Sequence, residues 1–280
     1  MSRIIALANQ KGGVGKTTTA VNLAASLVAM KRRVLVVDLD PQGNASTALS
    51  VEHPRGTVST YDVLVDGTPL AEAVTPHGEI PGLFVVPATI DLAGAEIELV
   101  SMVARENRLR RALDAHPQVH GEGEDRFDYV FVDCPPSLGL LTLNALVAGE
   151  EMLIPIQAEY YALEGLGQLL ETVEMVRTHL NAGLQVSNIV LTMYDARTRL
   201  ASGVADEVRS HFGDRVLSTA VPRSVRVSEA PSYGQSVMTY DPGSPGALSY
   251  LEVARELATT GQPAREGREG REGTEKEEQG

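Results

Sequence analysis

The stretch NQKGGVGKTTT, at residues 9–19, combines glycine, lysine and threonine at the spacing of a phosphate-binding loop. Its glycines allow the backbone to approach phosphate oxygens closely and to point N–H groups at them. Lys16 can reach the β- and γ-phosphates, the Thr17 hydroxyl can ligate Mg²⁺, and Thr18 can donate to the α-phosphate. We therefore expect the nucleotide contacts to come from one short run: Gly12, Gly13, Val14, Gly15, Lys16, Thr17 and Thr18.

The entrance of this loop departs from the usual pattern G-x-x-x-x-G-K-[ST]. That pattern requires glycine at position 10, where the chain has Gln10, and a second lysine, Lys11, follows it. A glycine-rich turn with a chance Lys-Thr pair is the simplest alternative. An apolar run before the loop and a helical pattern after it favour the phosphate site instead. The pattern by itself gives Lys11 no role, because Lys16 already serves the phosphates.

Two more motifs end apolar runs with carboxylates. VVDLDPQGN carries Asp38 and Asp40, and YVFVDCPPS carries Asp133. Because ligands bind at the carboxyl ends of the strands in open α/β sheets, we expect these groups to face the nucleotide. Asp133 is expected to hold Mg²⁺ through water, and Asp38 or Asp40 to orient the attacking water. Each aspartate also has an ordinary alternative, because Asp40-Pro41 can start a turn and Asp133 can simply end a strand.

Apolar runs of strand length alternate with segments of helical periodicity along the chain. This alternation predicts an α/β fold of the P-loop NTPase kind, a mostly parallel central sheet with helices on both faces. Strands are expected at residues 3–9, 32–40, 82–88, 128–136, 152–156 and 186–195, with 216–222 as an edge or late strand. Helices are expected at residues 15–30, 92–115, 138–147, 161–180, 201–212 and 246–260.

Composition sets the domain organisation and excludes several classes of protein. The 280 residues show no break in composition before position 260, so we expect one ATPase domain over residues 1–260. Residues 261–280 are expected to be a disordered, charged, low-complexity tail. The single cysteine, Cys134, excludes an intramolecular disulfide. With no signal peptide and no apolar stretch approaching about 18 residues, the expected location is the cytoplasm.

Separated motifs resemble those of the ParA/Soj partitioning ATPases: KGGVGKTTTAVNLAA, VLVVDLDPQGN, DYVFVDCPPSLGLLTLNAL, LTMYDARTRL, VPRSVRVSEAPSYGQSV and YDPGSPGALSYLEVARE. The resemblance covers about residues 2–258 and implies an ATP- and Mg²⁺-dependent homodimer that hydrolyses ATP slowly without a partner. In that family the lysine matching Lys11 crosses to the other subunit's ATP, and the residue matching Asp40 positions the hydrolytic water. Pro222 and Ser224 match the segment along the adenine, although this chain reads PRS where PRN is common.

A lysine supplied by a partner subunit would bind best while the γ-phosphate is present, because hydrolysis removes that charge. The nucleotide would then hold a face-to-face dimer together, and ADP would release it. The alternative for Lys11 is a solvated surface lysine. Met193 is a further candidate for packing on the base, with core packing as its alternative.

Positive charge gathers in one part of an acidic chain. Residues 181–230 contain six arginines and five acids, a net charge of +1, whereas the whole chain carries -13. Arg197 and Arg226 match positions that contact double-stranded DNA non-specifically in similar proteins, and Arg223 lies in the same segment. The alternative is that these arginines pair with neighbouring acids on a solvated surface. Doubling the patch in an ATP dimer would raise DNA affinity, which would fall steeply with salt.

The resemblance implies a nucleoid-associated ATPase that segregates chromosome or plasmid DNA and is stimulated by a ParB-type centromere-binding partner. Three alternatives remain. A nucleotide-gated adaptor would position a protein cargo without touching DNA. A MinD-like membrane-cycling ATPase would need a basic amphipathic helix at the C-terminus, and the tail has no apolar face. An iron–sulfur factor on the same fold would need cluster cysteines, and the chain has one cysteine.

Overall fold

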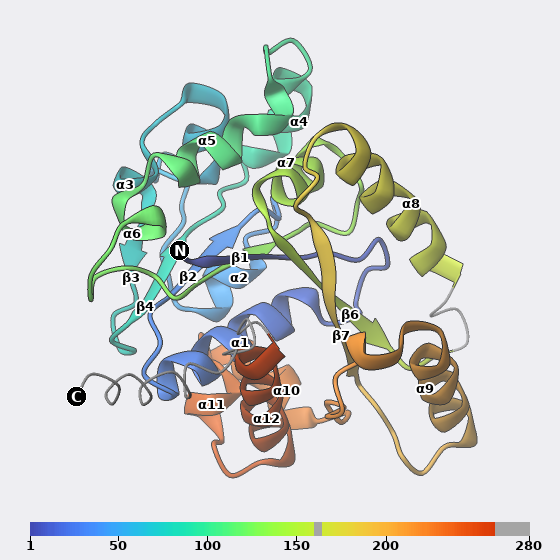
Figure 1. Ribbon diagram of the computed structural model, residues 1–280. Helices are drawn as coiled ribbons and strands as arrows, with labels where there is room; N and C mark the ends of the chain where they lie inside the picture. The colour runs from blue at the N-terminus through green and yellow to red at the C-terminus, as the bar shows by residue number, and fades with distance from the viewer. Residues whose placement is uncertain (160–163, 261–280) are drawn as a thin grey trace, which may run out of the picture.

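A seven-stranded sheet forms the centre of the computed structural model, which describes residues 1–159 and 164–260. The strand order is β3-β4-β2-β5-β1-β6-β7, and every neighbouring pair is parallel except β3 with β4 (Figure 1). The strands are β1 (Arg3–Leu7), β2 (Val34–Asp38), β3 (Thr75–Pro76), β4 (Leu83–Val86), β5 (Tyr129–Asp133), β6 (Glu151–Gln157) and β7 (Gln185–Thr192). The expected tail at 261–280 lies outside the described residues.

Helices cover both faces of the sheet, as the sequence predicts. One apolar cluster packs α4 (Leu92–Leu99), α5 (Arg108–Asp114), α7 (Leu140–Ala148), α8 (Glu164–His179) and α9 (Arg199–Phe212) against one face. A second cluster packs α1 (Lys16–Ala29), α2 (Asn44–Ala48), α10 (Val225–Glu229), α11 (Val237–Tyr240) and α12 (Pro245–Thr260) against the other. Short helices α3 (Leu70–Ala73) and α6 (Pro117–His120) complete the described fold. In Figure 1, α5 and α7 lie above the sheet and α1 and α12 below it.

The central strands are buried on both faces, which explains their continuous apolar runs. All five residues of β2 and all five of β5 are buried. The register aligns Asp38 with Asp133, and Leu7 at the end of β1 also pairs with Asp133. Three strand ends therefore meet at one level, where the site is expected.

The long helix expected over residues 92–115 is interrupted. After α4, Ala104 adopts a left-handed conformation with φ of 51°, and α5 begins only at Arg108. The buried Asn144 side chain of α7 bonds the backbone at this break. It donates to the Arg105 carbonyl at 2.9 Å and accepts from the Leu109 N–H at 3.2 Å. A tertiary contact thus replaces hydrogen bonds that a continuous helix would make.

The strand expected at residues 216–222 is also wrong. This segment forms only isolated bridges to the β7 side of the sheet, at Val216 and Pro222. Between them, the N–H groups of Ser218 and Thr219 donate to the Glu256 carboxylate of α12 at 2.7 and 2.9 Å. The Glu256 side chain therefore accepts hydrogen bonds from backbone N–H groups that would otherwise pair with a neighbouring strand. The two-residue β3, which contains Pro76, was not predicted.

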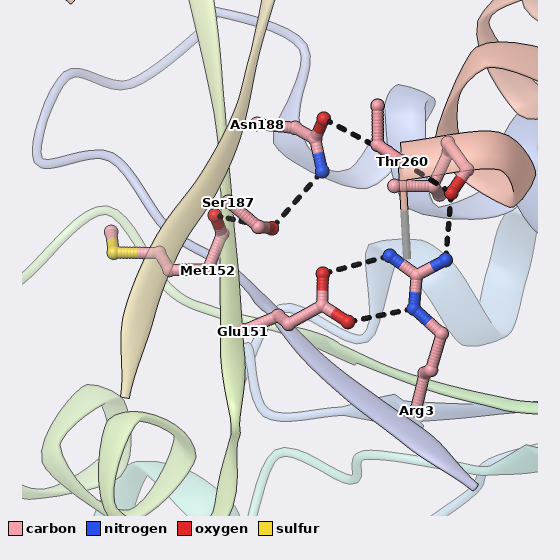
Figure 2. A network of polar contacts seen from close by, with 7 residues as sticks. Arg3, Glu151, Met152, Ser187, Asn188 and Thr260 are labelled. Atoms are coloured by element: carbon pink, nitrogen blue, oxygen red, sulfur yellow. Dashed lines mark hydrogen bonds and ion pairs between the residues drawn. The ribbon is translucent and has the colours of Figure 1, made fainter. Parts of the chain in front are cut away.

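A polar network fixes the last helix at the amino-terminal edge of the sheet (Figure 2). Arg3 at the start of β1 forms two hydrogen bonds with Glu151 at the start of β6, at 2.7 and 2.8 Å. The same guanidinium donates to the Leu257 carbonyl of α12 at 2.6 Å. Thr260 then donates to Asn188 of β7 at 3.4 Å. The C-terminal helix is thereby tied to three strands away from the expected site.

Candidate nucleotide-binding and catalytic site

The glycine-rich loop between β1 and α1 has the backbone geometry of a phosphate cradle. Gly13 and Gly15 have φ of 73° and 87°, values that disfavour other residues, and α1 begins at Lys16 directly after them. Thr192, the last residue of β7, donates to the Val14 carbonyl at 2.8 Å and anchors the loop from outside. The start of a 14-residue helix therefore points at the space that the loop encloses.

The Asn9 side chain fixes the entrance of the loop. It donates to the Pro155 carbonyl of β6 at 2.8 Å and accepts from the Lys11 N–H at 3.0 Å. Lys16 is buried, with 7% of the residue exposed, and its ammonium donates to the Lys11 carbonyl at 3.3 Å. Burial lowers the pKa of Lys16, and the nearby Asp133 carboxylate opposes that effect. A buried cation is thus held within the loop with a single long hydrogen bond.

Asp133 has the features expected of a Mg²⁺ site. Its side chain is fully buried, and neither carboxylate oxygen has a hydrogen-bond partner among the described residues. Burial and the neighbouring Asp38 raise its pKa well above the usual range, whereas Thr17 and Lys16 oppose that rise. Buried polar groups are normally hydrogen-bonded, so this orphaned carboxylate beside a threonine hydroxyl fits a bound cation with oxygen ligands.

Asp38 and Asp40 have different surroundings, which the residue pattern without the family resemblance did not distinguish. Asp38 is fully buried and accepts from the Ser46 N–H and hydroxyl at 2.9 and 2.7 Å and from the Asp40 N–H at 3.1 Å. Burial raises its pKa to about 6. Asp38 therefore has a structural role in holding the start of α2. Asp40 also shapes a turn, because it accepts from the Gln42 N–H at 3.0 Å, yet it lines the cavity described next.

A cavity of about 610 Å³ opens over the loop. Its walls include the phosphate loop, Asp40, and residues of α1 and α2: Gly12, Gly13, Gly15, Lys16, Thr17, Thr18, Val21, Asn22, Asn44, Thr47 and Ala48. An adjoining space of about 80 Å³ is lined by Pro222 and Ser224, and both spaces share Met193. Met193 is partly exposed with φ of 50°, so it lies at the wall rather than in the core. The two spaces together suit a triphosphate and a base.

Lys11 is folded back onto its own chain. Its ammonium lies 3.2 Å from the Glu159 carboxylate, and both side chains are partly exposed. Glu159 also accepts from Gln157 at 2.5 Å and lies 3.8 Å from the Arg223 guanidinium. Sequence analysis missed Glu159, although an acid two residues after β6 follows the same rule that identified Asp40 and Asp133.

All three DNA-contact candidates form ion pairs with acids of their own chain, Arg223 with Glu159 at 3.8 Å. Arg197, with 89% of its side chain exposed, donates twice to Asp195 at 2.8 Å. Hydrogen bonds from Arg197 lower the pKa of Asp195 to about 2. Arg226 lies 3.2 Å from Glu229 and 3.3 Å from Asp241. The expected alternative of surface ion pairs is therefore present at all three positions.

Comparisons with known proteins agree with the site. Residues 2–186 match a family described as AAA domain. The chain is 52% identical over 261 residues to sporulation initiation inhibitor protein Soj of Bacillus subtilis, covering 93% of this chain and 100% of that protein. It is 49% identical to chromosome partitioning protein ParA of Caulobacter vibrioides, covering 91% and 93% of the two chains.

Solved structures with bound nucleotide share the fold. Cobyrinic acid a,c-diamide synthase from Mycobacterium smegmatis, with ADP and magnesium, is 38% identical with a TM-score of 0.77, covering 92% of this chain and 94% of that one. The septum site-determining protein MinD of Pyrococcus horikoshii, with Mg-ADP, is 25% identical with a TM-score of 0.70, covering 92% and 96%. No helix within residues 1–159 and 164–260 is long and apolar enough to cross a membrane.

Proposed function

The chain belongs to the Soj/ParA family of chromosome-partitioning ATPases, and we propose that its site drives DNA segregation through an ATP-dependent dimer. ATP and Mg²⁺ are its cofactors, as the nucleotide-bound relatives of the fold indicate. The strongest support from the geometry is the orphaned Asp133 carboxylate, buried near Lys16, which lines the cavity.

The Thr17 hydroxyl and the Asp133 carboxylate would hold Mg²⁺ in this site. Bound there, Mg²⁺ supplies the charge that neutralises the β- and γ-phosphates. Lys16 binds the same phosphates from the loop, and the N–H groups of Gly13 and Gly15 orient them. Pro222 and Ser224 line the adenine end, where a serine in place of the common asparagine shortens the side-chain contact.

Asp40 holds the hydrolytic water. Its carboxylate lies at the wall of the cavity and is fixed by the Gln42 N–H. No arginine lines the 610 Å³ cavity in the described part of the chain, so the transition-state charge lacks an arginine finger. Hydrolysis is therefore slow in the chain alone, and a ParB-type partner accelerates it.

Lys11 exchanges one partner for another. In the single chain it rests on Glu159, a partly exposed carboxylate. The γ-phosphate of a second copy carries more charge and offers more acceptor oxygens, so it competes for the ammonium. When hydrolysis removes that phosphate, Lys11 returns to Glu159 and the copies separate.

The arginine segment binds duplex DNA non-specifically when two copies are joined. Arg197, Arg223 and Arg226, each paired with an acid of its own chain, present this charge around α10 and the start of α9. Doubling a weak patch raises affinity through effective concentration, so the ATP dimer coats the nucleoid and ADP releases it.

A gel shift with plain duplex DNA at low salt tests this cycle, run with ATP, with ADP and without nucleotide. Binding is expected only with ATP, and Lys11→Ala is expected to bind ATP normally but to remain monomeric by light scattering and to lose the DNA shift. ATP-dependent dimers without any DNA shift would favour the adaptor that positions protein cargo. The same association state with every nucleotide would overturn the cycle itself.

A further inference from the structure

A separate cavity of about 310 Å³ lies between α3, α5 and α6 (Figure 1). Its remaining wall is a five-residue π-helix, η1 (Asp62–Asp66), with the turn that follows it. Among the described residues, this cavity shares no lining residue with the 610 Å³ cavity over the phosphate loop. Its volume corresponds to about ten water molecules of the liquid, near the lower limit of ligand pockets in proteins. The cavity therefore suits a small ligand.

Most of the cavity wall is apolar. Val63 of η1, Leu70 of α3, Ala112 of α5 and Pro117 at the start of α6 line it. Val63 and Leu70 are each 2% exposed and belong to the apolar cluster on this face of the sheet. The wall is therefore a fixed part of the core, and a hydrocarbon group placed against it would be removed from water.

Two arginines of α5, Arg108 and Arg111, place positive charge at this wall. Arg108 is held in position, because its Nε and Nη2 atoms donate to the carbonyls of Leu64 and Val65 in η1 at 2.7 and 2.9 Å. Arg111 is exposed, and neither arginine forms an ion pair within residues 1–159 and 164–260. No aspartate or glutamate lines the cavity in the described part of the chain. In a chain with a net charge of -13, this local excess of positive charge indicates an anionic ligand.

A buried histidine adds a hydrogen-bond donor to the wall. The Nδ1 atom of His116 accepts from the Gln118 N–H at 3.2 Å. Burial lowers the pKa of His116, so the ring is neutral and its single proton is on Nε2. This Nε2–H group has no hydrogen-bond partner among the described residues. Since His116 is 5% exposed and lines the cavity, the donor is available to an acceptor oxygen of a ligand there.

We propose that this cavity binds a small organic carboxylate with a short apolar body. The two guanidinium groups and the His116 donor match the carboxylate oxygens, and the apolar wall matches the body of the ligand. The absence of acids from the described wall disfavours a cation, and the apolar area disfavours a fully polar anion such as inorganic phosphate. A π-helix is rare and is often found at functional sites, which agrees with the position of η1. Binding at this site does not depend on dimerisation or on DNA.

A ligand-observed NMR titration of the full chain with octanoate tests the site. Octanoate has about ten non-hydrogen atoms, which matches the cavity volume, and a dissociation constant of about 1 mM or lower is expected. Arg111→Gln removes the exposed charge from the wall and is expected to weaken binding about fivefold. Arg110→Gln is the matched control, because Arg110 precedes it on α5, pairs with Asp114 at 3.8 Å and does not line the cavity. Its binding of octanoate is expected to change less than about twofold.

A second measurement follows the His116 Nε2–H signal in ¹⁵N-labelled protein, which is expected to shift when octanoate is added. Binding of octanoate without this shift, or its displacement by saturating Mg·ATP, would place it elsewhere and overturn the assignment. Octanamide or inorganic phosphate binding as tightly as octanoate would overturn the proposed ligand class. Equal losses in Arg110→Gln and Arg111→Gln would reflect net charge alone, and no octanoate binding to the folded chain would exclude the site. None of these outcomes bears on the ATP-dependent cycle.

Discussion

The two edges of the sheet bury charge in different ways. At the amino-terminal edge, Arg3 meets Glu151 through two hydrogen bonds and donates a third to the Leu257 carbonyl. At the carboxyl-terminal edge, both oxygens of Asp133 are buried without a partner among the described residues. There, Lys16 donates to a backbone carbonyl at 3.3 Å. One edge completes its hydrogen bonds within the chain, and the other leaves them incomplete.

This difference separates structural from functional charge. An unsatisfied buried polar group costs about 1–3 kcal/mol, and more when it is charged. Such a free-energy cost is tolerated where a bound ligand removes it. The incomplete hydrogen bonding at the carboxyl-terminal edge therefore indicates preorganisation for Mg·ATP. Asp38, at the end of the strand next to that of Asp133, contrasts with Asp133. Its carboxylate accepts hydrogen bonds from the Ser46 N–H and hydroxyl, and it holds the backbone in place.

The largest effect is expected from Lys16→Ala. The buried ammonium meets the phosphates directly, and loss of about 4 kcal/mol of charged hydrogen bonding lowers ATP affinity about 1000-fold. Lys31→Asn is the matched control, because Lys31 is exposed just after the other end of the same helix and has a left-handed φ of 64° that asparagine tolerates. Isothermal titration with ATP measures both, and normal affinity in Lys16→Ala would exclude the loop as the phosphate site.

The next largest effect, on the rate of ATP hydrolysis, is expected from Asp40→Ala at the same edge of the sheet. Removal of the group that orients water slows hydrolysis about 100-fold, in the range of other acid–base residues, while ATP binding and dimerisation persist. Single-turnover phosphate release measures the rate, and light scattering with ATP detects the trapped dimer. Rapid turnover in this variant would assign the water to another residue.

A third variant pair compares the two edges directly. Arg3→Ala leaves Glu151 partly buried and unpaired, and we expect the free energy of unfolding to fall by about 2–3 kcal/mol. Asp133→Asn replaces a buried carboxylate that has no hydrogen-bond partner among the described residues and whose pKa burial raises, so the nucleotide-free protein is expected to be as stable as before or more so. Urea unfolding without nucleotide measures both. Equal destabilisation at both edges would contradict the distinction between structural and functional charge.

The sequence predicts the parts of the fold that depend on local pattern. The buried β-branched runs of β2 and β5 identify the strands, and their ends place Asp40 and Asp133 at one edge of the sheet. The glycines before Lys16 predict the loop, because left-handed backbone restricts the residue type. These features need no knowledge of tertiary contacts.

The features that sequence analysis missed depend on distant partners. The break after α4 needs the Asn144 side chain, and the loss of the strand at 216–222 needs Glu256. The family resemblance selects Asp40 for the water, but the structural role of Asp38 depends on Ser46, eight residues away. Glu159 follows a strand end as Asp40 does, but its pairing with Lys11 depends on the folded chain. Periodicity carries no information about such pairings.

A smaller effect is expected from Glu159→Gln, which leaves Lys11 without its partner in the single chain. An exposed ion pair contributes about 0–1 kcal/mol, so ATP-driven dimerisation is expected to tighten by up to about fivefold. Glu174→Gln is the control, because it removes an equal charge from a surface pair with Arg177. Analytical ultracentrifugation with a non-hydrolysable ATP analogue measures the dissociation constants. Weaker dimers in Glu159→Gln would show that this carboxylate belongs to the dimer contact instead.

The arginines test the limit of the comparison, because they are paired within the chain and yet proposed to bind DNA. Arg197 holds the pKa of Asp195 at about 2 through its hydrogen bonds, so this pair stays ionised at neutral pH and must open for a phosphate to bind.

Asp195→Asn weakens the ion pair that competes with phosphate for Arg197, and we expect the ATP-bound protein to bind duplex DNA two- to threefold more tightly. The magnitude is small because an exposed ion pair is weak. Asp214→Asn removes the same charge beyond the other end of α9, from a residue that forms no ion pair within the described residues. Fluorescence anisotropy over a salt series distinguishes the two: a gain limited to Asp195→Asn means that pairing masks Arg197, whereas equal gains reflect net charge. A loss of DNA affinity would mean that Asp195 holds Arg197 in its binding position, and paired charge would then be functional charge at this surface.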